Sequence, residues 1–277
     1  MKNVKVSVIM GIYNCSKYLP FAIESIINQT FTDWELIMCD DASTDDTYQI
    51  AKYYEQLYPE KITIIKNDKN CKLSYTLNRC LNQARGIYIA RMDADDLCDK
   101  KRFELQVNFL DSNPDISVVG TYMQRFNDNG LADIVEIKER PNYYTLRYSL
   151  PFHHATIMMR KEAYDLLNGY TVSNRTVRGQ DYDLWFRFFS LGLEGANIPI
   201  PLYYVREDMD AIKRRTFKVR FNTYRTTCYG FKLLKYPKFW IIRPTLEFIF
   251  KSLVPYAVIA QYRKWQKYRF LKKKENY

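Results

Sequence analysis

The chain has 277 residues, of which 47% are hydrophobic, 26% are charged and only nine are glycine. A chain of this length and composition can bury a substantial core, which excludes a disordered segment, a collagen-like fibre and a disulfide-dense miniprotein. The charge is uneven, because residues 206–277 hold 19 Lys and Arg against five Asp and Glu, while residues 1–205 carry a small acidic excess.

Two features indicate the cytosol. The apolar stretch that ends before Asn14 is about six residues long, which is too short for a signal peptide core or a membrane span. The six cysteines form no C-x-x-C pair and show no zinc-ligand spacing, so we interpret them as reduced residues that pack in the core. We therefore expect a chain that starts and stays in the cytoplasm.

Short apolar runs alternate with amphipathic segments in the first half, which is typical of a mostly parallel sheet with crossover helices. Strands are expected at residues 6–10, 34–39, 62–65 and 86–92. Helices are expected at residues 18–29, from a cap at Ser43 or Thr44 to about Tyr58, and at residues 75–84. Beyond Pro114, the pattern predicts strands at residues 116–120 and 155–159 and a helix at about residues 180–190. We expect residues 1–205 to form one α/β domain.

Residues 206–277 are expected to form a helical tail, in which Tyr, Phe and Trp are interleaved with Lys and Arg. Residues 239–262 contain a fairly apolar stretch, but Arg243, Glu247 and Lys251 interrupt it, and Pro244 and Pro255 would break or kink a helix. Because a central charge costs roughly 2.5–3.5 kcal/mol on insertion scales, a membrane span is disfavoured. A helix lying on an anionic membrane surface fits this pattern better.

The segment from Ala90 to Asp96 places Asp93, Asp95 and Asp96 at the carboxyl end of an expected strand. Carboxylates this close together repel one another unless positive charge lies between them. Asp93 and Asp95, two residues apart on extended backbone, point the same way, and their hard oxygens suit Mg²⁺ or Mn²⁺ together with phosphate oxygens from a substrate. The alternative is a solvated acidic loop that caps a helix near Lys100.

Two other expected strands also end in polar residues. Tyr13 and Asn14 follow the first strand, and Asp40 and Asp41 follow the second. If the strands are neighbours, their carboxyl ends share one crevice with Asp93. A carboxylate there can accept the imide N–H of uracil, and Tyr13 can stack on a base. The alternative for Asp41 is a helix N-cap. The sequence has no P-loop and no dinucleotide-binding glycine motif.

Four segments together resemble the family 2 glycosyltransferases with the GT-A fold. They are residues 6–14, 36–45, 90–96 and 180–185, which occur in the family's order and with its usual spacing. The resemblance covers about residues 4–205. It implies a nucleotide-sugar transferase that inverts the anomeric centre, of the kind that builds bacterial surface polysaccharides.

The resemblance also implies roles for individual residues. Asp41 matches the acid that recognises the base, and Tyr13, Asn14 and Arg91 lie with it where the family binds the nucleotide. Asp93 and Asp95 match the D-x-D motif, in which the first acid touches the ribose and both bind the metal on the diphosphate. Asp181 matches the family's general base. Gln180 stands where the family often has Glu, which removes a negative charge beside Asp181 and leaves its pKa less elevated.

Two residues are candidates for the acceptor side. His154 matches a histidine found near the acceptor in many relatives, whereas we interpret its neighbour His153 as structural. Trp185 has two interpretations, as a core residue of the helix at about residues 180–190 or as an aromatic wall beside the acceptor sugar. A run of basic residues from Arg206 to Arg215, with Arg178, can neutralise a diphosphate or form a solvated basic face.

We therefore expect a metal-dependent inverting transferase that moves a sugar from a UDP-sugar to a saccharide acceptor carried on a polyprenyl diphosphate. The tail would hold it peripherally on the inner face of a bacterial plasma membrane. One alternative is a nucleic-acid-binding module that uses the basic tail, but acidic residues 1–205 would repel a phosphate backbone, so we expect no nucleic-acid partner. The nearest alternative among enzymes is a sugar nucleotidyltransferase, which releases pyrophosphate.

Overall fold

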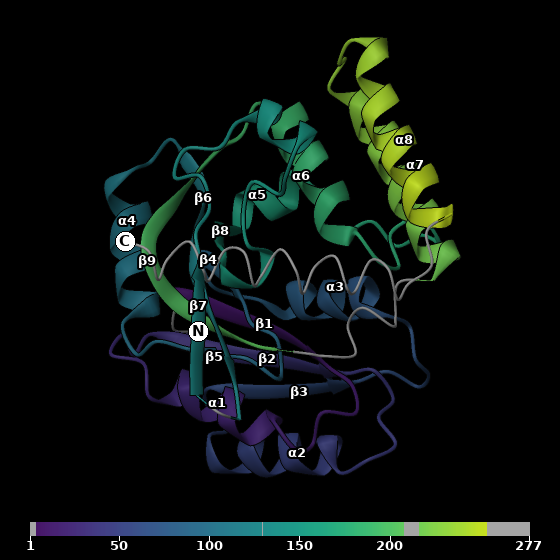
Figure 1. The fold of residues 1–277 in the computed structure, drawn as a ribbon. Helices are drawn as coiled ribbons and strands as arrows, with labels where there is room; N and C mark the ends of the chain where they lie inside the picture. The colour runs from purple at the N-terminus through teal and green to yellow at the C-terminus, as the bar shows by residue number, and fades with distance from the viewer. Residues whose placement is uncertain (1–3, 129, 208–215, 254–277) are drawn as a thin grey trace.

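The computed structural model describes residues 4–128, 130–207 and 216–253, whose fold is shown in Figure 1. Within these ranges the strands are β1 (Val6–Ile12), β2 (Trp34–Asp40), β3 (Ile62–Lys66), β4 (Tyr88–Arg91), β5 (Leu97–Cys98), β6 (Ile116–Asn127), β7 (Gly130–Val135), β8 (Met158–Arg160) and β9 (Glu194–Arg206). The α-helices are α1 (Leu19–Ile27), α2 (Thr47–Leu57), α3 (Leu73–Gln83), α4 (Arg102–Ser112), α5 (Lys161–Leu166), α6 (Gln180–Ser190), α7 (Phe217–Leu233) and α8 (Ile242–Leu253). Short 3₁₀ turns are η1 (Tyr143–Arg147), η2 (His154–Thr156) and η3 (Lys238–Ile241).

The strands of the described residues form one sheet in the order β3-β2-β1-β4-β8-β6-β9-β5, with β7 paired to β6. Strands β3, β2, β1 and β4 are parallel to one another, whereas β8 is antiparallel to both β4 and β6. The long strands β6 and β9 are parallel, and β9 is strongly curved in Figure 1. Because the first four strands are parallel, their carboxyl ends share one edge, which is where open α/β sheets bind ligands.

Both faces of the first half of the sheet are covered by helices. Val8 and Met10 of β1 belong to the core cluster shared with α1, α2 and α4, while Ile9 belongs to the cluster shared with α3 and α6. In Figure 1, α1 and α2 lie on one side of β1–β3 and α3 lies on the other. Successive strand residues point to opposite faces, so a strand covered on both sides needs a continuous apolar run such as this one.

The described part of the basic tail contains a pair of helices, α7 and α8, at one end of the molecule (Figure 1). Helix α7 packs on α6, where Gly230 lies so close to the ring of Phe186 that a Cβ would not fit. No side chain of α8 is fully buried. Among the helices that the structure describes, none is long and apolar enough to cross a membrane. Residues 208–215 and 254–277, including Pro255, lie outside the described residues.

Three details differ from the expected elements. Helix α2 begins at Thr47 without a cap from Ser43 or Thr44, because both residues instead form hydrogen bonds with Asn14. The expected strand at residues 155–159 is divided between η2 and β8. Strand β9 continues to Arg206, which pairs with β6, so the sheet extends one residue past the expected end of the first domain. The division into domains 1–205 and 206–277 stays a prediction.

Candidate active site

The carboxyl ends of β2, β1 and β4 lie side by side. Strand β1 is hydrogen-bonded to β2 on one side and to β4 on the other, and all three run in the same direction. Ile12 at the end of β1 is in register with Asp40 of β2, and Arg91 ends β4. The strands that precede Tyr13, Asp41 and Asp93 are therefore neighbours, which is the condition for a shared crevice.

Asp41 holds the loop that precedes α3. Its Oδ1 accepts hydrogen bonds from Asn67 Nδ2 at 2.8 Å and from the backbone N–H of Cys71 at 2.7 Å, and its Oδ2 accepts one from the backbone N–H of Lys72 at 2.9 Å. Lys72 has a φ of 72°, in the left-handed region. The alternative in which Asp41 caps a helix is wrong, because α2 begins only at Thr47.

Asn14 connects the loops that follow β1 and β2. Its backbone N–H donates to Ser43 Oγ at 3.0 Å, and its side-chain Oδ1 accepts from the backbone N–H of Thr44 at 2.9 Å. Asn14 has a φ of 46°, which is uncommon for residues other than glycine but better tolerated by Asn. Tyr13 next to it is 48% exposed. The turn thus fixes the backbone and leaves an accessible aromatic ring at the carboxyl edge of the sheet.

Arg91 is a buried cation that pairs with Asp93. Its Nη2 donates to Asp93 Oδ1 at 2.8 Å, and the Arg91 residue is 4% exposed. Burial lowers the pKa of the guanidinium, but Asp93 raises it, and the net shift of the Arg91 pKa is upward. The backbone N–H of Asp93 also donates to the hydroxyl of Tyr203 at 3.0 Å. Part of the negative charge of the acidic segment is therefore balanced by the protein itself.

The other two acids of this segment differ in exposure. Asp96 is buried and accepts a hydrogen bond from the backbone N–H of Arg206 at 2.9 Å, whereas Asp95 is exposed. Burial, followed by the charges of Asp93 and Asp95, raises the pKa of Asp96 well above its usual range. The charges of these carboxylates therefore interact, and the segment that carries them is not simply a solvated loop.

Asp93 and Asp95 have the chemistry of a divalent-cation site. Among residues 4–128, 130–207 and 216–253, no three His, Cys, Asp or Glu side chains are grouped to hold a metal by themselves. Two carboxylates are sufficient where substrate phosphates supply further oxygens, which is the usual arrangement for Mg²⁺. Burial raises the pKa of Asp96, the charges of Asp93 and Asp95 raise it further, and a bound cation would relieve this second effect. These residues therefore fit the ion.

Asp181 lies in the first turn of α6, near Arg91 and Asp93. Its Oδ1 accepts a hydrogen bond from the backbone N–H of Tyr182 at 2.9 Å. Burial raises the pKa of Asp181, the Tyr182 N–H and the positive charge of Arg91 lower it, Asp93 raises it, and the net shift is upward. The presence of Gln180 thus does not prevent an elevated pKa. The structure brings Asp93 and Asp181 into one electrostatic environment around Arg91.

The two acceptor-side candidates lie inside the protein. Trp185 is 0% exposed and packs on Phe152 with 4.6 Å between ring centroids, so the interpretation as a core residue is confirmed and the aromatic wall is a wrong expectation. His154 is buried, and its Nε2 lies 3.0 Å from the Tyr170 hydroxyl. Burial and the charge of Arg91 lower the pKa of His154 well below its usual range, which favours a neutral ring. Its role beside the acceptor stays a prediction.

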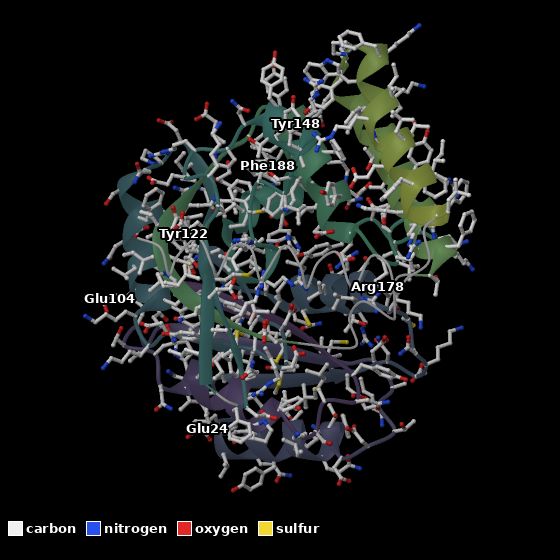
Figure 2. All side chains as sticks on the ribbon, in the orientation of Figure 1. Glu24, Glu104, Tyr122, Tyr148, Arg178 and Phe188 are labelled. Atoms are coloured by element: carbon white, nitrogen blue, oxygen red, sulfur yellow. The ribbon has the colours of Figure 1, made fainter. Side chains whose placement is uncertain are left out.

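Two tyrosines of the site, Tyr203 and Tyr170, were not expected from the sequence, and they come from β9 and from the loop after α5. Neither stands in a motif, so the only available signal was the aromatic content. Arg206 was noted as the start of a basic run, and it lies with its guanidinium 4.2 Å from the ring centroid of Tyr18. Arg178, labelled in Figure 2, lies on the exposed loop before α6. The rest of the run, residues 208–215, lies outside the described residues.

Known sequences resemble this chain over most of its length. The family model "Glycosyl transferase family 2" matches residues 7–167. The "Putative glycosyltransferase EpsE" of Bacillus subtilis is 44% identical over 94% of this chain and 93% of its own. The "Amylovoran biosynthesis glycosyltransferase AmsE" of Erwinia amylovora is 28% identical over 89% and 92%. The "UDP-Glc:alpha-D-GlcNAc-diphosphoundecaprenol beta-1,3-glucosyltransferase WfaP" of Escherichia coli is 27% identical over 77% and 81%.

Solved structures share the fold. Residues 1–349 of S. aureus TarS, in complex with UDP-GlcNAc, superpose with a TM-score of 0.70 at 18% identity, covering 87% of this chain and 69% of TarS. The mannosyltransferase PcManGT of Pyrobaculum calidifontis, in complex with GDP-Man and Mn²⁺, gives a TM-score of 0.60 at 20% identity, covering 84% of this chain and 65% of the other. The α/β architecture expected from the sequence is confirmed as that of the GT-A enzymes.

Proposed function

The chain belongs to glycosyltransferase family 2, and from that premise we propose that it transfers a sugar from a UDP-sugar to a saccharide acceptor with inversion of the anomeric carbon. The observation that carries this proposal is the shared environment of Asp93, Arg91 and Asp181 beside the ends of β1, β2 and β4. We assign the product to a bacterial surface polysaccharide, in line with the name of AmsE. A sugar nucleotidyltransferase is a wrong alternative for a member of this family.

The donor nucleotide would lie across the ends of β1 and β2. Asp41 Oδ2 accepts one hydrogen bond, from Lys72, and a carboxylate oxygen has capacity for another, here the imide N–H of uracil. The exposed ring of Tyr13 can stack on the base, while Asn14 supports the turn that presents it. TarS, which shares the fold, was solved with UDP-GlcNAc, and this supports a uridine donor.

Asp93 and Asp95 would hold the divalent cation, Mn²⁺ or Mg²⁺, together with the diphosphate of the donor. When bound, the ion neutralises the charge that grows on the leaving diphosphate. Arg91 keeps the Asp93 carboxylate oriented through the bond from its Nη2. The Mn²⁺ in the PcManGT structure supports this choice of ion, as does the hard-oxygen character of the two ligands.

Asp181 would act as the general base. Its carboxylate accepts the proton of the acceptor hydroxyl, the hydroxyl oxygen forms a bond to the anomeric carbon, and the bond from that carbon to the diphosphate oxygen breaks. Attack from the face opposite the leaving group inverts the centre. The upward shift of the Asp181 pKa makes the carboxylate a stronger base than an exposed aspartate.

The acceptor would be carried on a polyprenyl diphosphate at the cytoplasmic face of the plasma membrane. WfaP is named for an acceptor of this kind. One apolar face of α8 is exposed, and it consists of Ile242, Leu246, Ile249, Phe250 and Leu253. Arg243 and Lys251 on the same helix, together with the basic residues of α7, would favour anionic headgroups. Tyr148, labelled in Figure 2, lies against Arg243 of α8. We propose no nucleic-acid partner.

A thermal-shift screen tests the function. Nucleotide-sugars are added with and without Mn²⁺, and the donors that stabilise the protein are then assayed for release of the free nucleoside diphosphate. We expect the largest shift with a UDP-sugar and Mn²⁺ together, because the ion and the diphosphate complete each other's binding site. Stabilisation by GDP-sugars alone would overturn the assignment of uridine, and release of pyrophosphate would overturn the transfer reaction.

A further inference from the structure

One face of α7 contacts the loop that leads into α6. Asn222 Nδ2 donates to the backbone carbonyl of Asn174 at 2.9 Å, and Asn222 is buried. Four residues later, Thr226 Oγ1 lies 3.3 Å from the carbonyl oxygen of Arg175 and 3.0 Å from that of Asn222, so its hydrogen is shared between them. Residues four apart lie on the same face of a helix. The helix thus provides a row of donors to the loop backbone.

The same loop is also held by charge. Arg175 Nη2 lies 2.7 Å from Oδ1 of Asp183, a fully buried residue of α6, and the Arg175 guanidinium is 4.4 Å from the ring centroid of Tyr229 on α7. Asp183 also accepts from Arg187 Nε at 2.9 Å. Arg175 therefore lies between α6 and α7 and makes contact with both.

The loop ends immediately before the proposed base. Gly179 has a φ of 93°, in the left-handed region, and the hydroxyl of Thr223 on α7 is 4.0 Å from the place where a Cβ of Gly179 would be. Asp181 follows two residues later. Asn174, Val177 and Arg178 are exposed. Thr176 is buried, and its hydroxyl donates to the backbone carbonyl of Thr171 at 2.6 Å, so it holds part of the segment from within. The order of the remaining residues depends on the α7 groups that contact their backbone.

We propose that Asn222 is a positioning residue for the transfer reaction, with Thr226 in a lesser role, and that α7 thereby sets the place of Asp181. This inference rests on the proposed role of Asp181 as the general base. It gives the first helix of the basic tail a part in catalysis that is separate from any contact with a membrane. No atom of Asn222 needs to touch the substrate.

The test compares three substitutions in the full chain. Asn222→Leu keeps the size of the side chain and removes the donor, and Thr226→Val removes the hydroxyl at nearly constant shape. Thr227→Val is the matched control, because the Thr227 hydroxyl donates to the carbonyl of Thr223 within α7 at 3.1 Å. Amide hydrogen exchange is followed for peptides that cover residues 174–182 and, as a distant reference, residues 34–66.

We expect faster exchange at residues 174–182 in Asn222→Leu, a smaller increase in Thr226→Val, and none in the control or at residues 34–66. In UDP release from UDP-N-acetylglucosamine and UDP-glucose, kcat of Asn222→Leu should fall roughly 10- to 100-fold, since a small misplacement of a reacting group has effects of this size. The KM for the donor should stay unchanged, because Asp41 and Asp93 lie on other loops.

Unchanged exchange at residues 174–182 in Asn222→Leu would overturn the proposal, as would an unchanged kcat when the wild type is active. Faster exchange throughout the chain, with kcat and KM both altered, would show a role in general stability and would equally overturn it. If the wild type releases UDP from neither donor, the proposed function is at fault, and the exchange measurement still decides whether Asn222 orders the loop.

Discussion

Arg91 donates a 2.8 Å hydrogen bond from Nη2 to Oδ1 of Asp93, and the same cation lowers the pKa of Asp181 against the effect of burial. One buried guanidinium therefore acts on the acid assigned to the donor and on the acid assigned to the acceptor. A positive charge in this position offsets part of the repulsion between the two carboxylates. The site is thus partly organised before any ligand arrives.

Replacing Arg91 by Met removes this cation at similar length. The pKa of Asp181 should then rise further, because burial and the charge of Asp93 would be opposed by backbone N–H groups such as that of Tyr182 but no longer by the guanidinium. A general base works in its deprotonated form, so the acidic limb of the pH–rate profile should move to higher pH. UDP release measured across pH checks this. Arg125→Met, which removes an exposed ion pair with Asp133, serves as the control and should leave the limb in place.

Replacing Asp181 by Asn tests the base itself. In the wild type, activity should fall as the pH drops through the pKa of Asp181, which lies above the ordinary carboxylate value of 3.8. The variant should lose about 10²- to 10⁴-fold in kcat together with this pH dependence, while its affinity for UDP changes little. Asp165→Asn, at an exposed carboxylate on α5, is the control. Full turnover by the Asp181→Asn variant would show that Asp181 is not the general base.

Asp183 should matter for stability more than for chemistry. Burial raises its pKa, but the Thr171 hydroxyl, Arg187 and Arg175 lower it, and the net shift is downward. Because the pKa of Asp183 is depressed in the folded state, the stability that its ion pairs contribute is present above the unfolded-state pKa. It is lost as pH falls through the folded-state pKa. Asp183→Ala should cost roughly 3–5 kcal/mol in urea unfolding, because it removes the buried carboxylate that pairs with the half-buried Arg175 and Arg187. A cost below about 1 kcal/mol, the size of an exposed ion pair, would contradict the pairing.

The contact between α6 and α7 can be tested at Gly230. An added methyl group there meets the ring of Phe186, so Gly230→Ala should destabilise the protein by about 1–3 kcal/mol despite the better helix propensity of Ala. Thermal unfolding is the measurement. Phe186→Leu makes room for the added methyl group, so the double variant should lose less stability than the sum of the losses in the two single variants. Strict additivity would mean that the helices do not meet at these residues.

The exposed face of α8 gives a further prediction. Leu246→Asp places a charge in the middle of the apolar face, and it should abolish co-sedimentation with vesicles that contain anionic phosphatidylglycerol. Leu131→Asp is the control, because Leu131 is exposed to a similar extent but lies on β7, far along the chain from the tail. Equal sedimentation of both variants and the wild type would contradict membrane docking through α8.

Sequence patterns located the residues that lie at strand ends, because a continuous apolar run that stops at acids is typical of a buried strand reaching the edge of a sheet. The places of Asp41 and Asp93 follow from this pattern together with the family resemblance, whereas that of Asp181, in the first turn of α6, follows from the resemblance alone. Sequence patterns did not decide whether Trp185 lies in the core or beside the acceptor. Helical periodicity shows on which face of a helix a residue lies, but not whether neighbouring segments cover that face. Tyr203 and Tyr170 reach the site from distant segments, so only the assembled sheet and loops bring them to Arg91.

Hydrogen bonding also decided details that residue type left ambiguous. Ser43 and Thr44 are good N-cap residues, but their bonds to Asn14 in the neighbouring loop prevail. Asp41 resembles an N-cap by position, yet three donors from the segment before α3 surround it. Each outcome depends on which loop lies beside which in space, and a single sequence does not encode that relationship locally.

Asp41, Asp95 and Asp181 should all face one nucleotide-binding cleft, and the proposed transfer reaction depends on this arrangement. A crystal of the protein grown with UDP and Mn²⁺, and measured at the manganese absorption edge, examines it directly. We predict an anomalous peak bound by Asp93 or Asp95 and the diphosphate, with the uracil beside Asp41 and Tyr13. A manganese ion and nucleotide bound elsewhere, with these carboxylates contacting neither, would contradict it.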